Sequence, residues 1–392
     1  MKKSILIVLC CITLSITNVV ASQFDPILDK LVEKGILTTT DSQEVRNEAN
    51  TILTKEVKEN ETVINNAVKK ALPKVTVSGY TQFYYSADPT LGGLEPFGVK
   101  RARVAFNCKL NDWATFKMQP DFDGIASPTG TTTISGKTVV TSVPTVAFKE
   151  VWADITPIKD LVTLRIGQYH QPFGFELPYS SSRKKVFDTP QYMSKVITSD
   201  YDYGIQWWGN LPRDGLKDFL QWKLAILNGT TTGTETNGKK DFAVKLSTKP
   251  VKEVELSLSC YERYIDSENK YETSYNLYSK IEDDSLLPGL FFTLEYVGGK
   301  DSTAKKEIMN LILTLECKPF SFISSDLSFI APVIRLERWD PDMWKGKDEI
   351  HYYTVGCNFY FDKSVRLLID YLVKDDNIPD NNRFNAMLQL NY

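Results

Sequence analysis

Histidine is almost absent from this sequence. His170 and His351 are the two histidines among 392 residues. Metal sites and acid–base enzymes of this size ordinarily use more, because imidazole titrates near neutral pH and binds metal ions. The scarcity disfavours an enzyme and predicts neither a bound metal nor a cofactor. A hydrolase built on either histidine stays open, since catalytic triads follow geometry rather than residue order.

Cysteine is also sparse and forms no motif. Cys10 and Cys11 lie near the N-terminus, and no C-x-x-C pair occurs. The absence of paired spacing disfavours both a zinc site and a disulfide framework. The other four cysteines are widely spaced: Cys108, Cys260, Cys317 and Cys357.

The chain has no excess of charge of one sign. Lys and Arg number 46 against 49 Asp and Glu, and the longest basic run is Arg183–Lys185. Nucleic acid is therefore not predicted as a partner, because its phosphates require a basic surface. Mean hydropathy is slightly negative. The sequence thus excludes a bundle of membrane-spanning helices.

One apolar run stands at the N-terminus. Met1-Lys2-Lys3 precedes the apolar stretch from Ile5 to Leu14, and Val19-Val20-Ala21 supplies a candidate cleavage site. This order is typical of a secretory signal peptide, predicted here to span residues 1–22. The alternative is a retained membrane anchor.

Residues 23–72 differ in composition from everything that follows. They are rich in Glu, Lys, Leu, Ile and Val, with no aromatic residue after Phe24. We expect a short helical, coiled-coil-like periplasmic segment with a capping box at Asp41 and Glu44, ending at Pro73. Its predicted seam consists of Val57, Asn60, Ile64, Ala67 and Ala71. A helix lying on its own domain is the alternative.

Aromatic residues are abundant, with 19 Tyr, 20 Phe and 7 Trp. They favour pleated, half-exposed surfaces and membrane–water interfaces. After Pro73, apolar and polar residues alternate with a period of two. In the last segment Phe384, Ala386, Leu388, Leu390 and Tyr392 form an apolar face, and the residues between them are mostly polar. Such alternation predicts β-strands with one apolar face.

About sixteen strands of this kind can be placed between residues 73 and 392, an even number as in bacterial outer-membrane barrels. A soluble sandwich would show the same alternation. The signal peptide, aromatic residues near strand ends, and Arg and Lys at mid-strand favour a membrane barrel whose polar face lines water. The predicted fold class is all-β: a transmembrane antiparallel β-barrel of about sixteen strands, residues 73–392, preceded by the short α-helical segment.

Several segments resemble a known family. From Arg165 to Glu176 the sequence follows the pattern R-x-G-Q-x-x-x-P-F-G-x-E. This pattern is similar to that of the phosphate-selective porin O and P family, and weaker similarity runs from Val75 to Tyr392. The resemblance implies a trimeric, passive channel of sixteen strands in the outer membrane of a Gram-negative-type bacterium, narrowed by a loop folded into its lumen.

The lumen charges depart from the strongly basic interior that the resemblance implies. Basic and acidic residues on the predicted inward faces are nearly balanced. The inward basic residues are Arg101, Arg103, Lys109, Lys117, Arg165, Lys223, Lys245, Arg335, Arg366 and Lys374. The inward acidic residues are Glu150, Asp154, Asp241, Glu255, Glu295, Glu316, Glu337 and Asp370. Balance argues against a uniform anion field.

Two groups of basic residues are the candidate selectivity sites. Arg101, Arg103, Lys109, Lys117 and Arg165 come from neighbouring predicted strands and form a candidate basic strip. The segment from Gln168 to Asp200 is too long for a hairpin turn and is the candidate constriction loop. Its triplet Arg183, Lys184 and Lys185 would line the narrowest point, or else form an exposed, solvated face.

The sequence thus predicts an outer-membrane porin for passive diffusion of small hydrophilic solutes, with a bias towards anions such as phosphate. Its expected partners are those solutes, outer-membrane lipid and further copies of the chain in a homotrimer. The alternative is a secreted, soluble β-rich protein that binds glycans or builds a surface structure.

Overall fold

The computed structural model describes residues 26, 28–48, 51, 55, 58, 74–89, 97–123, 131–134, 137–140, 146–197, 199–213, 216–229, 237–265, 268–301, 305–375 and 381–392. The chain divides into two compact units, Met1–Pro73 and Lys74–Tyr392. The boundary falls where the composition of the sequence changes.

The first unit is helical where it is described. Helical residues 28–33 end at Gly35, which has a positive φ of 66°. A second helix begins at Thr39, and Thr38 and Asp41 cap it reciprocally through side-chain-to-backbone hydrogen bonds of 3.0 and 3.1 Å. The Thr38 hydroxyl, which donates to the Asp41 carboxylate at 2.6 Å, and the Thr38 backbone N–H lower the pKa of Asp41. The capping box therefore begins three residues before the predicted one.

The expected signal peptide and most of the expected coiled-coil seam lie outside the described residues. Their roles stay predictions. Among the described residues, no helix combines the length and apolar character needed to cross a membrane.

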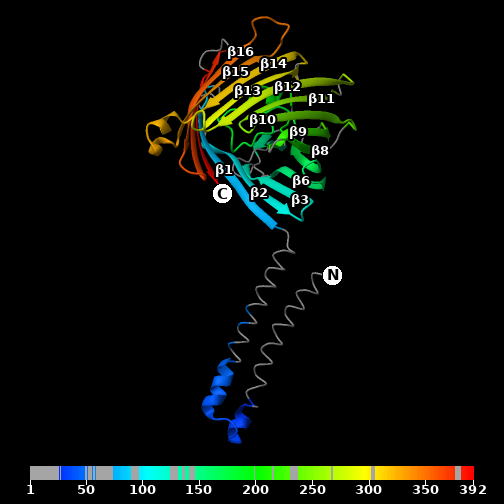
Figure 1. Ribbon diagram of the computed structural model, residues 1–392. Helices are drawn as coiled ribbons and strands as arrows, with labels where there is room; N and C mark the ends of the chain where they lie inside the picture. The colour runs from blue at the N-terminus through cyan, green and yellow to red at the C-terminus, as the bar shows by residue number, and fades with distance from the viewer. Residues whose placement is uncertain are drawn as a thin grey trace. The chain divides into compact units, whose positions relative to one another are not determined.

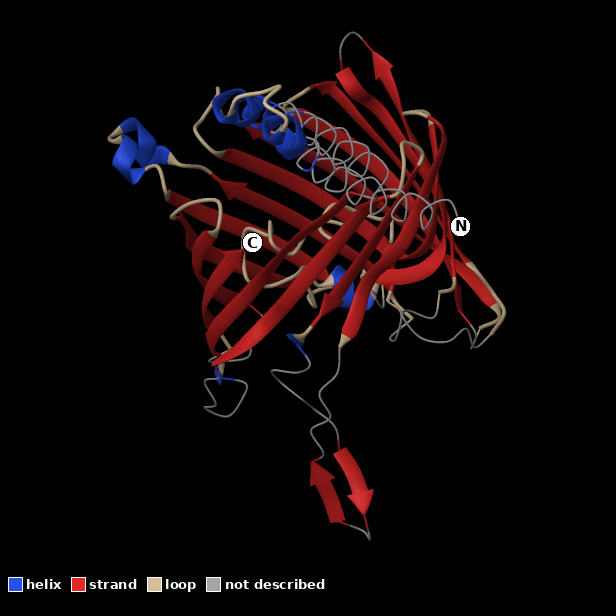
Figure 2. Ribbon diagram, turned by 90° about the horizontal axis from the view of Figure 1, so that it is seen from below, coloured by secondary structure: helices blue, strands red, loops and turns tan. Residues whose placement is uncertain are grey.

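The second unit is a closed antiparallel barrel of sixteen strands, as predicted (Figures 1 and 2). Its first eight strands are β1 (Lys74–Ala87), β2 (Phe97–Lys109), β3 (Ala114–Asp121), β6 (Ala147–Ile158), β7 (Val162–His170), β8 (Tyr201–Arg213), β9 (Leu216–Leu227) and β10 (Asp241–Val251). The other eight are β11 (Val254–Ile265), β12 (Lys270–Asp283), β13 (Leu290–Lys300), β14 (Glu307–Glu316), β15 (Ile330–Asp340), β16 (Ile350–Tyr360), β17 (Val365–Asp375) and β18 (Arg383–Asn391). Strands β4 (Thr131–Ile134) and β5 (Lys137–Val140) form a separate hairpin.

The barrel closes where its first strand meets its last. Tyr80 pairs with Asn391 and Ala87 with Phe384, while the backbone of Gly79 exchanges hydrogen bonds of 2.8 and 3.0 Å with Tyr392. Closure leaves no sheet edge with unpaired backbone groups, which is the condition for a β-structure in lipid.

Side chains alternate between the two sides of the wall, as the sequence predicts. In β10, Asp241 and Lys245 are buried inside the barrel, whereas Phe242, Val244 and Leu246 are exposed on its outer face. A wall that is polar inside and apolar outside is the reverse of a soluble barrel. The soluble alternative is therefore set aside. The four cysteines of the described chain are unpaired: Cys108, Cys260, Cys317 and Cys357.

The two ends of the barrel carry different connections. Short turns at residues 110–113, 159–161, 252–253 and 361–364 lie at one end, together with one longer connection, 317–329. The strands are joined at the other end by longer segments, including 171–200 and 341–349. Outer-membrane barrels have short turns on the periplasmic side and longer loops on the outer side. Segment 171–200 is the longest of these connections in which nearly every residue is described.

Candidate functional site

The segment from Gln171 to Asp200, here called the inner loop, packs inside the barrel. It includes the short helix α4 (Tyr192–Lys195). Phe173 and Tyr192 are fully buried, and they share one apolar cluster with wall residues such as Val297 and Ile312. An apolar loop face against an apolar part of the inner wall holds the loop in place through ordinary hydrophobic burial.

Wall side chains satisfy the backbone of the inner loop. Glu295 on β13 is 1% exposed and accepts hydrogen bonds from the backbone N–H of Phe175 (2.6 Å) and the hydroxyl of Tyr192 (3.1 Å). The side-chain amide of Asn276 donates a third bond of 2.9 Å to the same oxygen. Buried backbone donors need such partners, so Glu295 is a structural acceptor for the loop.

Gly174 shows why this part of the loop has its sequence. It has a φ of 65°, and a Cβ there would lie 2.7 Å from Oε1 of Glu295 and 2.9 Å from the Tyr192 hydroxyl. Its N–H donates to Ser259 Oγ, and its carbonyl accepts from Lys245 Nζ at 2.6 Å. The left-handed conformation and the close approach both require glycine. The P-F-G motif is therefore a loop anchor.

The same arrangement recurs along the wall. Glu337 accepts a hydrogen bond from the N–H of Gln191 at 2.8 Å, and Asp370 accepts one from the N–H of Phe187 at 2.7 Å. Basic residues bind the loop carbonyls: Arg335 donates to Asp188 and Arg366 to Lys184. We call the wall from β10 to β18, which the inner loop lies against, the covered half.

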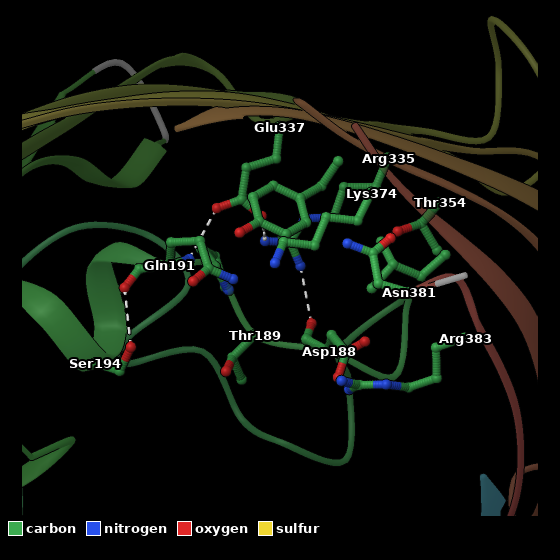
Figure 3. A pocket seen from close by; sticks show the side chains of 13 residues that line it. Asp188, Thr189, Gln191, Ser194, Arg335, Glu337, Thr354, Lys374, Asn381 and Arg383 are labelled. Carbon is green, nitrogen blue, oxygen red and sulfur yellow. Dashed lines mark hydrogen bonds and ion pairs between the residues drawn. The ribbon is translucent and has the colours of Figure 1, made fainter. Parts of the chain in front are cut away.

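A cavity of about 390 Å³ remains between the inner loop and strands β15–β18 (Figure 3). Figure 3 shows Arg335 bonded to Asp188, Gln191 bonded to Glu337, and Arg383 pointing towards Asp188. Arg383 is ion-paired with Asp188 (3.1 Å) and with Asp88 (2.7 Å). Charges of both signs meet in this cavity and largely neutralise each other.

A second cavity, of about 370 Å³, lies between a different part of the inner loop and other strands. Its wall comes from strands β2, β3, β6, β7, β8 and β9, here called the open half, with Tyr80 of β1. The loop contributes Pro172, Pro178, Ser180 and Ser181. The remaining lining residues are Arg103, Lys117, Gln119, Glu150, Trp152, Arg165, His170, Gln206 and Lys223.

The second cavity is positively charged. Four basic side chains line it, namely those of Arg103, Lys117, Arg165 and Lys223, against one carboxylate, that of Glu150. Three of the four are ion-paired: Arg103 with Asp121 (2.6 Å), Lys117 with Glu150 (2.6 Å) and Arg165 with Asp154 (2.7 Å). Asp121 and Asp154 are buried and do not line the cavity, so the charged side chains that line it are mostly basic.

The predicted basic strip is partly assembled. Arg103, Lys117 and Arg165 meet in the second cavity. Arg101 donates a hydrogen bond of 3.0 Å to Gln82, whose amide in turn bonds the loop carbonyl of Ser181. Lys109 lies apart, at the end of β2, where its exposed side chain pairs with Asp112.

The basic triplet of the loop is divided among three environments. Lys184 is buried and pairs with Glu176 inside the loop at 3.3 Å. Lys185 pairs with Glu316 of β14 at 2.6 Å. Arg183 alone is exposed, in the turn closed by its N–H donating to Ser180. The sequence left two alternatives for the triplet, the narrowest point or an exposed, solvated face. In the structure Arg183 is exposed, whereas Lys184 and Lys185 hold the loop through ion pairs.

Sequence reasoning gave no role to two residues of the site. Lys223 was recognised as inward-facing but lay outside the proposed strip, since β9 is distant from β2 and β3 in the sequence. Glu295 was counted as a lumen charge, although it bonds the loop. Strand alternation could locate both residues, but nothing local in the sequence reveals the partner of either.

A closed sixteen-stranded barrel that is apolar outside, polar inside and narrowed by an inner loop is an outer-membrane porin, a water-filled channel for small hydrophilic solutes. A family model described as phosphate-selective porin O and P matches residues 77–276. The chain belongs to this family, as its resemblance to the motif predicts, and is a protein of the Gram-negative outer membrane.

Solved porins have the same fold. OmpF of Salmonella typhi, solved in complex with daunomycin, is 12% identical, with a TM-score of 0.59 over 82% of this chain and 98% of that chain. An anion-selective porin from Comamonas acidovorans is 11% identical, with a TM-score of 0.55 over 82% and 100% of the two chains. OmpT of Vibrio cholerae, solved in a trimer form, is 8% identical, with a TM-score of 0.53 over 82% and 99%. No curated protein matches this chain.

Proposed function

We propose that this porin prefers anions and that Arg103, Lys117 and Arg165 produce the preference. The observation that carries the proposal is the charge of the second cavity, where four basic side chains face one carboxylate. A lumen lined by one sign of charge raises the local concentration of counter-ions. The anion-selective porin from Comamonas acidovorans, which has the same fold, supports the proposal.

The inward basic and acidic residues are nearly equal in number, which would argue against an anion preference. The placement of the acidic residues counters this argument. Glu295, Glu337 and Asp370 bond the backbone of the inner loop, and Glu316 pairs with its Lys185. Carboxylates engaged in this way contribute less to the field in the water-filled path than their number implies. The exposed part of the lumen is consequently more basic than the count of inward-facing residues in the sequence implies.

We also propose that the protein is a homotrimeric channel rather than an enzyme. OmpT of Vibrio cholerae, which shares the fold, has been solved as a trimer. The two histidines cannot act together, because His170 lines the lumen on β7, whereas His351 on β16 lies on the outward face beside Tyr353. Size measurement of the detergent-solubilised protein tests the trimer.

The zero-current potential of the refolded protein in a planar bilayer, measured under a potassium chloride gradient, tests the anion preference. We expect a potential of the sign set by chloride flow. A potential set by potassium flow would overturn the proposed preference and leave a general diffusion channel.

A further inference from the structure

One cation of the open half differs from the others. Lys223 on β9 has no hydrogen bond or ion pair to any residue that the structure describes, although it lines the second cavity. Arg103, Lys117 and Arg165 are each held by a carboxylate at 2.6–2.7 Å. Lys223 is half-buried, and an ammonium group that is partly withdrawn from water without a hydrogen-bond partner loses hydration that a bound anion can replace.

The neighbours of Lys223 increase that cost. Its partner in the register with β10 is Lys245, and like charges opposite each other destabilise a sheet. Lys245 donates to the carbonyl of Gly174 and so has a partner. On the other side Lys223 faces Trp208 of β8, whose indole Nε1 is buried and has no hydrogen-bond partner in the described structure. Among the described residues, the ammonium of Lys223 and the indole N–H of Trp208 are donors without an acceptor, and a bound anion would supply one.

The rest of the cavity restricts what kind of anion fits. Arg103, Lys117 and Arg165 each already donate to a carboxylate. Within the described part of the chain, Lys223 is therefore the cation of this cavity whose donors are all free, and one free ammonium matches a singly charged anion better than a multiply charged one. Apolar and aromatic surface stands nearby: Pro172 and Pro178 of the loop, and Tyr80 of β1, also line the cavity. A single free ammonium beside apolar surface is complementary to a singly charged group attached to an apolar body.

We infer that Lys223 binds the carboxylate of a small organic anion in transit, with the apolar body of the solute against the prolines of the inner loop. This inference rests on the proposed anion preference and names the class of solute. Lys223 then sets the affinity for the carboxylate, while Arg103, Lys117 and Arg165, each held in place by a carboxylate of the wall, supply the general anion preference along the path. A porin of this kind favours an organic carboxylate over inorganic phosphate.

The test uses the refolded full-length chain in planar bilayers at pH 7. Chloride conductance is recorded while benzoate, acetate or inorganic phosphate is added, and the concentration that halves the current is determined for each. We expect benzoate to act at the lowest concentration, and acetate to act more weakly because it lacks the apolar body. A lower half-blocking concentration for phosphate than for benzoate would overturn the inference.

Variants locate the effect. Lys223→Gln should raise the half-blocking concentration of benzoate roughly tenfold or more, the loss expected for one charge-assisted contact. Lys223→Arg should retain block, and Trp208→Phe should weaken it less. Lys109→Gln, an exposed paired lysine at the rim, is the matched control and should change nothing. Unaltered benzoate block in Lys223→Gln, with Lys223→Arg folded and conducting, would overturn the assignment.

The zero-current potential and the block measurements distinguish a failure of this inference from a failure of the proposed anion preference. A wild-type potential set by chloride together with unaltered block in Lys223→Gln removes the carboxylate site and keeps the anion preference. A wild-type potential set by potassium, together with block that depends on Lys223, removes the anion preference and keeps the carboxylate site.

Discussion

The same residue types have different roles in the two halves of the barrel wall. In the covered half, Glu295 and Glu337 accept hydrogen bonds from the backbone of the inner loop. In the open half, Glu150 pairs with Lys117, and the lysine still lines a cavity. The covered half bonds the inner loop and retains a cavity of mixed charge at β15–β18, whereas the inward cations of the open half line a cavity that is mostly basic. An inward carboxylate is a loop anchor in the first setting and part of the channel field in the second.

This difference between the two halves shows that the effective charge of a wide lumen cannot be obtained by summing the charges of all inward-facing residues. A buried carboxylate that accepts two or three hydrogen bonds is matched locally, and its effect on a passing ion is correspondingly small. We therefore expect the selectivity of this channel to depend on which half of the wall the inner loop covers. Three experiments sharpen or break this comparison.

The largest effect is expected from Glu295→Ala in the covered half. The N–H of Phe175, the hydroxyl of Tyr192 and the amide of Asn276 would lose their acceptor. A buried donor left without an acceptor costs about 1–3 kcal/mol, so with three such donors the free energy of unfolding should fall by at least about 3 kcal/mol. Single-channel conductance should rise and become noisier as the inner loop loosens. Urea unfolding and bilayer recordings measure both.

Glu150→Ala is the matched truncation in the open half. Glu150 binds Lys117 and the indole N–H of Trp152 but no backbone group of the loop. We expect quiet channels with stronger anion preference, because Lys117 loses its counter-charge. Noisy, enlarged channels in both variants would mean that the two halves do not differ in function.

The fold of the barrel could be predicted from the sequence, because strand alternation is a local property. In β18, Phe384 and Leu388 are exposed while Asn385 and Gln389 are buried, as the pattern with a period of two indicates. The closure of the barrel follows from the length of the chain and the number of such segments. The position of the loop in the lumen came from the family resemblance.

The environment of the individual charges could not be predicted. Phe175 and Glu295 are 120 residues apart in the sequence, so nothing near Glu295 marks it as an acceptor. Lys184 and Lys185 are adjacent, yet one pairs within the loop and the other with Glu316 of β14. Local pattern determines which face of the wall a side chain occupies, but tertiary packing determines its partner.

A smaller effect is expected when two cations of the open half are neutralised together. Lys117→Gln with Arg165→Gln leaves Glu150 and Asp154 without their counter-charges. A charge about 4 Å from a passing ion contributes about 1 kcal/mol in water, or roughly a fivefold factor in permeability. The zero-current potential should therefore lose its chloride sign.

Lys280→Gln in the covered half is the control for this double variant. Lys280 of β12 pairs with Glu255 of β11 and with Glu282 of its own strand. We expect its potential to remain close to that of the wild type. A loss of chloride selectivity as large as that of the double variant would show that cations of both halves act on the permeating ion equally.

The smallest effect is expected from Arg183→Gln at the turn of the inner loop. Arg183 is exposed, and an exposed charge is screened by salt over about 10 Å at 0.1 M ionic strength. Permeability should change by less than about twofold, in line with the few tenths of a kcal/mol typical of exposed charges. Comparing the zero-current potential at low and high salt separates this screened contribution from that of the wall. A change as large as that of the double variant would place selectivity on the loop, and the comparison between the two halves of the wall would then no longer explain it.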